Sequence, residues 1–140
     1  MKQGFIVVLD RYVSSNQIHQ GGKIRHPKRQ REFLEWLDTM EHGVFGLPRP
    51  DSIIYLDVPT TISQSLLKTE DQKRKKVYVS KRKIDLVEND EEYMRRSRES
   101  ALKLVKKLNN WVKIVCTKKG TLLSREEIAE KVWEQVRKVL

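Results

Sequence analysis

The segment richest in groups that could do chemistry is Asp10–Gly22, which reads DRYVSSNQIHQGG and directly follows the apolar run Phe5–Leu9. In open α/β sheets, ligands bind outside the carboxyl ends of the strands, so a carboxylate and a guanidinium placed there suit a phosphate site. The planar fork of Arg11 can grip two phosphate oxygens at once. Asp10 can orient a magnesium shell or a neighbouring cation.

Small polar side chains continue the same segment. Ser15, Asn16 and Gln20 offer short hydrogen-bond donors and acceptors that could read the edge of a nucleobase. The alternative is a simple strand-to-helix turn that is capped by the aspartate and a serine and carries a surface arginine. No HExxH, CxxC or GxSxG pattern elsewhere in the sequence competes with this segment.

A second chemical signal is the basic run KRKKVYVSKRK at residues 73–83, which holds seven basic residues and no acidic one. The whole chain has a formal net charge of +10. Such a balance suits an anionic partner: nucleic acid, a membrane surface or nucleotide phosphates. The run itself is either a solvated loop or helix face, or a segment that grips phosphate.

Three apolar runs must position these groups. Phe5–Leu9, Ile53–Leu56 with Val58, and Trp111–Cys116 have strand character, and the first two are nearly continuous, as in parallel strands buried on both faces. Helical patterns separate and follow the strands. They begin at Pro27 (ending at Gly43), near Thr61, near Asn89 and, with capping-box spacing to Glu127, at Ser124.

The order of strands and helices predicts one α/β domain over residues 1–140, with a parallel sheet and no linker. No apolar stretch approaches the roughly 20 residues of a membrane span, so we expect no membrane partner. Cys116 is the only cysteine, which excludes an internal disulfide and favours a buried structural thiol. The expected location is the cytoplasm.

Three stretches together resemble the thymidylate kinases. DRYVSSNQIHQGG resembles the signature in which a strand ends in Asp-Arg-Tyr, and RPDSIIYLDVPTTIS resembles the Pro-Asp and Leu-Asp-Val-Pro landmark around the next strand. The run from KKVYVS to LVKK resembles the lid and the long helix after it. The resemblance covers nearly the whole chain. It implies a P-loop kinase-like three-layer fold that is incomplete here, with three of the five strands of the parallel sheet present.

The resemblance implies an enzyme that phosphorylates thymidine monophosphate (dTMP) to the diphosphate with ATP and magnesium. In that family Arg11 would grip the substrate phosphate, and Asp10 would lie near that phosphate and, indirectly, the metal. Ser15 and Asn16 would face the thymine. His19 stands where the family often has Tyr, beside the 2′ carbon of the sugar, and Gln20 belongs to the same face. For His19 the alternative is a plain helix-surface histidine.

The family's lid, expected at about residues 69–88, supplies cations that stabilise charge on the transferred phosphoryl group. Arg74 is the first candidate for the catalytic cation. The competing lid cations are Lys73, Lys75, Lys81 and Arg82. Thr117–Gly120 would sit where the family packs adenine.

The sequence lacks the GxxxxGK[ST] loop with which the family holds ATP, and Gly21–Gly22–Lys23 is only a superficial match. The family's first strand would lie between the strands matching Phe5–Leu9 and Ile53–Val58. Either these two strands close together, or another chain fills the slot. We therefore expect inactivity alone and a separate N-terminal, P-loop-bearing partner. A truncated gene and an incomplete record are alternatives, and a homodimer stays open.

Two other functions stay open beside the kinase. One is a nucleotide-binding remnant without catalysis. The other is a small basic nucleic-acid-binding module, which is disfavoured because Tyr78 is the only aromatic residue in the basic run. A deoxynucleoside kinase is a weaker enzyme alternative, since SSNQIHQGG fits the monophosphate kinases better.

Overall fold

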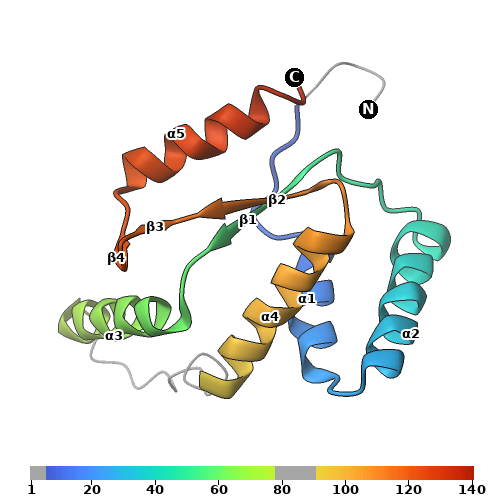
Figure 1. The fold of residues 1–140 in the computed structure, drawn as a ribbon, viewed down its shortest axis with the longest axis horizontal. Coiled ribbons are helices and arrows are strands. Elements are labelled where there is room, and N and C mark those ends of the chain that lie inside the picture. Colours follow the sequence, from blue (N-terminus) through green and yellow to red (C-terminus); the bar gives the residue numbers. More distant parts are fainter. Residues whose placement is uncertain (1–5, 78–90) are drawn as a thin grey trace.

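The computed structural model describes residues 6–77 and 91–140, with the side chains of residues 70–77 excepted. Helices and short strands alternate along the chain (Figure 1). In chain order the elements are α1 (Val13–Lys23), α2 (Pro27–Asp38), the π-helix η1 (Thr39–Val44), β1 (Ile53–Asp57), α3 (Thr60–Val77), α4 (Glu91–Lys107), β2 (Trp111–Val115), β3 (Thr117–Lys118), β4 (Thr121–Leu122) and α5 (Arg125–Val136).

The centre of the molecule is the parallel pair β1 and β2, in register from Ile53 opposite Trp111 to Asp57 opposite Val115. Both strands coincide with apolar runs that the sequence predicted as parallel strands. The backbone pairing continues one step further, because the amide of Cys116 donates to the carbonyl of Asp57. Cys116 is fully buried, as predicted, and burial raises the pKa of its thiol, which keeps it protonated and unreactive.

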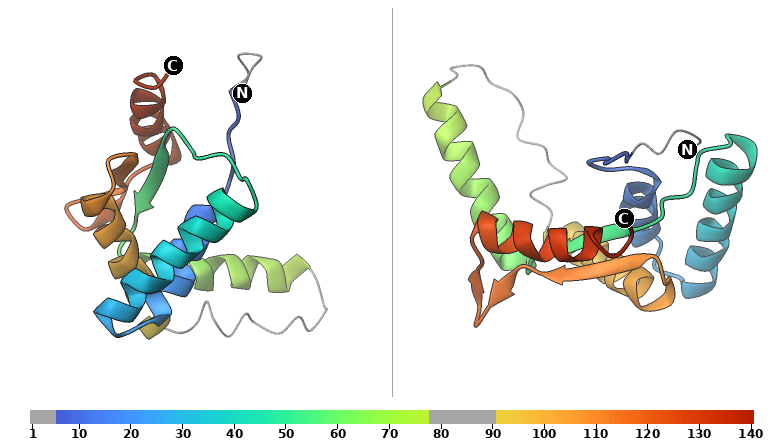
Figure 2. Two further views of the ribbon diagram at one scale, coloured as in Figure 1. Left: turned by 90° about the vertical axis from the view of Figure 1, so that its right-hand side faces the viewer. Right: turned by 90° about the horizontal axis from the view of Figure 1, so that it is seen from above.

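Helices cover the two sides of this pair. Helix α5 packs on β2 from one side, while α4 packs on both strands from the other and α1 packs on α4 (Figure 1). Helix α2 lies outside α1, as the turned views also show (Figure 2). Ala101, Leu104 and Ser97 are buried on the inner face of α4, the helix expected to begin near Asn89. The capping box of α5 is also formed, between Ser124 and Glu127.

The first predicted strand is wrong for the part that the structure describes. Residues 6–9 form no strand, and their side chains are between 50% and 85% exposed. A strand needs a neighbour to receive its backbone hydrogen bonds. Here β1 pairs only with β2 among the described residues, and residues 6–9 do not close onto its other edge. The described parallel sheet therefore has two strands rather than the expected three.

Smaller differences concern helix ends and burial. Helix α3 continues to Val77, so the beginning of the basic run is helical rather than part of a connection between two helices. The π-helix carries the chain past Gly43, where the α2 pattern was expected to stop. Helix α5, which packs on β2, contains no buried residue. Thr117–Gly120 belongs to a tight hairpin between β3 and β4.

Within residues 6–77 and 91–140, no helix combines the length and the apolar character needed to cross a bilayer.

Candidate functional site

A cavity of about 340 Å³ opens at the carboxyl end of β1. Four parts of the chain meet there: the start and middle of the α1 region, the end of β1, the first turns of α3, and α4. Its lining residues are Arg11, Ile18, His19, Tyr55, Leu56, Val58, Thr60, Ser63, Leu67, Tyr93, Met94, Ser97 and Arg98. This is where a ligand is expected in an α/β fold, and the volume is at the lower end of the range for small-molecule sites.

Arg11 occupies a special backbone position beside this cavity. Its φ angle is +69°, in the left-handed region that non-glycine residues rarely adopt. Such conformations persist where the surroundings hold them, and they cluster at functional sites. Helix α1 begins two residues later, with no side-chain cap and no acidic residue in its first turn. The local backbone therefore places a cation and the positive end of a helix together.

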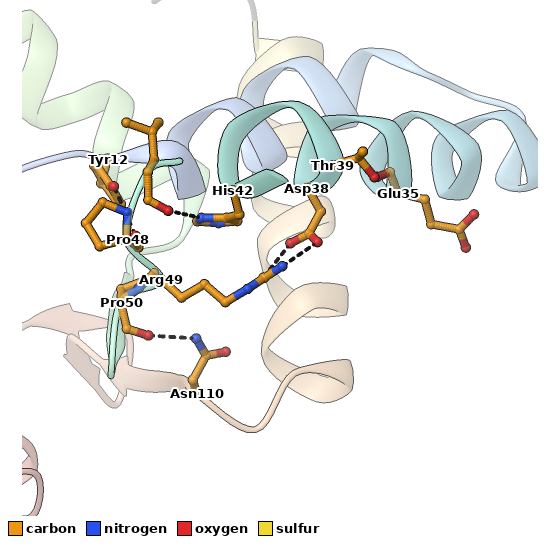
Figure 3. A network of polar contacts seen from close by, with 10 residues as sticks. Tyr12, Glu35, Asp38, Thr39, His42, Pro48, Arg49, Pro50 and Asn110 are labelled. Atoms are coloured by element: carbon orange, nitrogen blue, oxygen red, sulfur yellow. Dashed lines mark hydrogen bonds and ion pairs between the residues drawn. The ribbon is translucent and has the colours of Figure 1, made fainter. Parts of the chain in front are cut away.

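A network of polar contacts fixes the segment next to Arg11 (Figure 3). The hydroxyl of Tyr12 donates to the carbonyl of Pro48 at 3.0 Å, which ties the start of α1 to the loop before β1. Arg49 of that loop makes two hydrogen bonds to Asp38, at 2.6 and 2.7 Å, and Asn110 donates to the carbonyl of Pro50 at 3.2 Å. The loop is thus held from α1, α2 and the approach to β2 at once.

His19 of α1 contacts α4 beside the cavity. Its ring stacks on Tyr93, with ring centroids 5.9 Å apart and an interplanar angle of 17°. Its Nδ1 is buried and has no hydrogen-bond partner in the part of the chain that the structure describes. Burial lowers the pKa of His19, and the nearby charges of Arg11 and Lys23 lower it further. These effects favour the neutral form of the ring beside the cavity.

The end of β1 contributes a buried ion pair. Asp57, only 6% exposed, accepts hydrogen bonds from the guanidinium of Arg98 on α4, and Lys113 lies 4.0 Å from the same carboxylate. Tyr55 precedes this carboxylate by two residues. Burial and then the charge of Asp57 raise the pKa of Tyr55 to about 12, so its hydroxyl stays protonated.

The structure separates the residues that the sequence grouped together. Arg11 and His19 both line the cavity, whereas Asp10, Ser15, Asn16 and Gln20 do not. Asn16 is exposed and points to η1, where its Nδ2 donates to Oε1 of Glu41 at 3.0 Å. Gln20 accepts a hydrogen bond from Lys23 at 3.0 Å. The roles of these residues toward a nucleotide stay predictions.

The cations expected in the lid fall mostly outside the part that can be described. Lys73, Arg74 and Lys75 lie on the backbone of α3, but their side chains are not described, and Lys81 and Arg82 lie outside the described residues altogether. The choice of Arg74 as the catalytic cation stays a prediction.

Sequence reasoning missed several cavity residues. Tyr55, Tyr93, Ser97 and Arg98 line the cavity but were not singled out as site residues. Helical spacing could place Tyr93 and Ser97 on one face, but it gives no sign that this face borders a cavity. Among the described side chains, no group of three or more His, Cys, Asp or Glu is placed to hold a metal ion.

A protein-family model described as "Thymidylate kinase" matches residues 1–128. No curated protein matches the chain, and no solved structure matches it.

Proposed function

We propose that this chain, which belongs to the thymidylate kinase family, binds dTMP and takes part in its phosphorylation to the diphosphate by ATP and magnesium. The observation that carries the proposal is the family match over residues 1–128, which includes the segment Asp10–Gly22. Arg11 supports it from the structure, because this residue of the family signature lines a cavity at the carboxyl end of a parallel strand. In the proposal Arg11 holds the acceptor phosphate.

The remaining substrate assignments follow the family signature. His19, a neutral ring at the same cavity, would lie beside the deoxyribose, where a side chain leaves no room for a 2′ hydroxyl. Ser15, Asn16 and Gln20 would read the thymine. These three do not line the cavity beside Arg11, so their assignment to the thymine rests on the family signature alone.

We propose that the cradle for ATP comes from a polypeptide segment outside these 140 residues. The GxxxxGK[ST] motif is absent from the sequence. Within the described part of the chain the outer edge of β1 is unpaired and residues 6–9 are exposed, which supports a place where such a segment could add a strand. Phosphoryl transfer depends mainly on positioning of nucleotide, metal and acceptor, so without this segment we expect no activity.

The described residues do not fit a complete magnesium site. Asp10 is exposed and stands apart from any acidic cluster in the described part of the chain. In the family magnesium neutralises phosphate charge, and Asp10 would act on it only indirectly.

The test is reconstitution. The chain is assayed for phosphoryl transfer from ATP to dTMP alone and with an added polypeptide that carries a strand, a P-loop and the helix after it. We expect no turnover by the chain alone and restored turnover in the mixture. A matched partner with its P-loop lysine changed to alanine is the control, and it should not restore activity.

Two results would contradict the proposal. Turnover by the chain alone, above about 1 per second as kinases show, would refute the need for a separate cradle. Failure of the chain to prefer dTMP over thymidine, alone or in the mixture, would refute the acceptor site.

The runner-up is a nucleotide-binding protein without catalysis. The missing ATP loop favours that reading, and it predicts dTMP binding with no turnover in any mixture.

A further inference from the structure

Among the described residues, two arginines border the cavity at the end of β1, and no acidic side chain does. Arg11 reaches it from the start of α1 and Arg98 from α4. The nearest acidic group on the strand, Asp57, is buried and does not line the cavity. The cavity therefore presents positive charge to a ligand, and two guanidinium groups match the two charges of a phosphate dianion.

The guanidinium of Arg98 is held in a defined direction. Its Nε donates to Oδ1 of Asp57 at 2.7 Å, and its Nη2 donates to Oδ2 at 3.2 Å. This arrangement uses one side of the planar group. Its Nη1 makes no hydrogen bond within residues 6–77 and 91–140, so its two N–H groups stay available to another acceptor.

The charged groups around the cavity carry a net positive charge that a dianion could neutralise. The carboxylate of Asp57 is shared between Arg98 and Lys113, whose Nζ lies 4.0 Å away. One negative charge thus faces two positive charges, and Arg11 adds a third at the cavity. A phosphate group bound between the arginines would bring this cluster close to neutrality.

We propose that Arg98 is a second arginine of an anion site, which binds a phosphate group together with Arg11, and that Asp57 is the residue that positions it. The assignment of this phosphate to dTMP rests on the proposed function, but the anion site itself does not. The competing explanation is that Arg98 and Asp57 form only a structural link between α4 and β1.

Inorganic phosphate is the probe, titrated into the full chain and followed by NMR. In the unmodified chain, the side-chain N–H signals of Arg98 and Arg11 should shift with a common dissociation constant. Arg98→Ala should weaken phosphate binding by about tenfold or more, the loss expected for a hydrogen bond to a charged group. The matched control is Arg95→Ala, which removes an arginine of the same helix that pairs with Glu92 and does not line the cavity.

The variant Asp57→Asn distinguishes two effects of Asp57 on phosphate binding: orientation of the Arg98 guanidinium and repulsion by its negative charge. Removing a negative charge next to the site should tighten phosphate binding if charge alone matters. If Asp57 positions the guanidinium, the variant should bind phosphate several-fold more weakly, because Asn can accept only one of the two hydrogen bonds. Arg98→Lys keeps the charge without the planar fork, so it tests the same point should Arg98→Ala fail to fold, as judged by circular dichroism.

The outcomes decide between the explanations. Equal phosphate affinity of Arg98→Ala and Arg95→Ala, or no shift of the Arg98 signals at millimolar phosphate, would overturn the anion site. Tighter binding by Asp57→Asn would overturn the positioning role. If phosphate binds through Arg98 while dTMP binds no better than thymidine, the anion site stands and the proposed function fails. If dTMP is preferred equally by the parent and Arg98→Ala, the proposed function stands and this inference fails.

Discussion

Gly22 of α1 lies so close to α4 that a Cβ atom added to it would come within 3.3 Å of the carbonyl oxygen of Arg96. The same Cβ would lie 3.3 Å from the Cα of Ser97. Both neighbours are backbone atoms of a helix, which cannot rotate away as a side chain can. This contact brings the two helices together along the wall of the cavity, where His19 and Tyr93 stack.

We therefore predict that Gly22→Ala destabilises the protein by roughly 1–3 kcal/mol, the usual cost of overpacking. Alanine is favoured over glycine inside a helix, so propensity alone predicts the opposite sign. Gly43→Ala is the matched control, because among the described atoms its Cβ would meet just a methyl group of Thr39, at 3.8 Å. Urea unfolding of the two variants checks this. Equal free energies of unfolding of the two variants would show that α4 shifts to accommodate the added methyl group without cost.

The lowered pKa of His19 predicts a stability that depends on pH. Burial first, and then Arg11 and Lys23, hold the folded-state pKa below the usual value of 6.5. As the pH falls below that value, the unfolded chain takes up a proton that the folded chain does not, so the free energy of unfolding decreases. The loss continues until the pH reaches the folded-state pKa.

The variant His19→Gln cannot take up this proton. We expect its free energy of unfolding to fall less than that of the parent between about pH 7 and the folded-state pKa of His19, as measured by urea titrations at several pH values. The difference between the two curves isolates His19 from the other titrating groups. Parallel curves would mean that the ring is not held neutral.

The proposed acceptor site predicts a selective effect of Arg11→Ala. The variant should lose the preference for dTMP over thymidine, by on the order of ten- to a hundredfold, because a charge-assisted hydrogen bond contributes about 1.5–3 kcal/mol. NMR titration suits this measurement, since it also detects weak binding. Arg31→Ala, at a largely exposed position on α2, is the control and should keep the preference. An unchanged preference in Arg11→Ala would remove Arg11 from the phosphate site.

We predict that replacing the buried carboxylate of Glu41 by a neutral amide stabilises the protein. This residue of η1 is only 5% exposed, and its Oε2 has no partner among the described residues, while Oε1 accepts from Asn16 at 3.0 Å. Glu41→Gln keeps the bond to Asn16 and removes a buried charge, so we expect an increase of about 1 kcal/mol in the free energy of unfolding. Glu35→Gln, at an exposed side chain, should change it by less than about 0.5 kcal/mol. A destabilised Glu41→Gln would indicate that the charge has a partner in solution.

The sequence predicted the parts of the fold that depend on local pattern. The runs that became β1 and β2, the start of α2 at Pro27, and the capping box of Ser124 are all recognisable within a few residues. The π-helix was not foreseen, because helical spacing does not distinguish it from the last turn of α2. The hairpin was also missed, although Lys119 and Gly120, both with positive φ, form its turn.

The sequence did not predict which elements pair or pack with one another. Phe5–Leu9 has the composition of a buried strand, yet its described residues 6–9 have no ladder to join. Arg11 and His19 were correctly singled out as belonging to one segment, and both reach the cavity. Arg98 comes from a helix more than seventy residues further along the chain, and the packing of α4 against α1 and β1 brings it there.

The unpaired segment Ile6–Leu9 also bears on how the protein behaves at high concentration. Its exposed aliphatic side chains, and the edge of β1 that no described strand pairs with, are surfaces on which a second molecule could add a strand, which is how ordered aggregates begin. The net charge of +10 opposes such encounters through mutual repulsion. That repulsion reaches about 30 Å at 0.01 M salt but only about 8 Å at physiological ionic strength. Added salt should therefore lower the colloidal stability of this chain while leaving its folding largely unchanged.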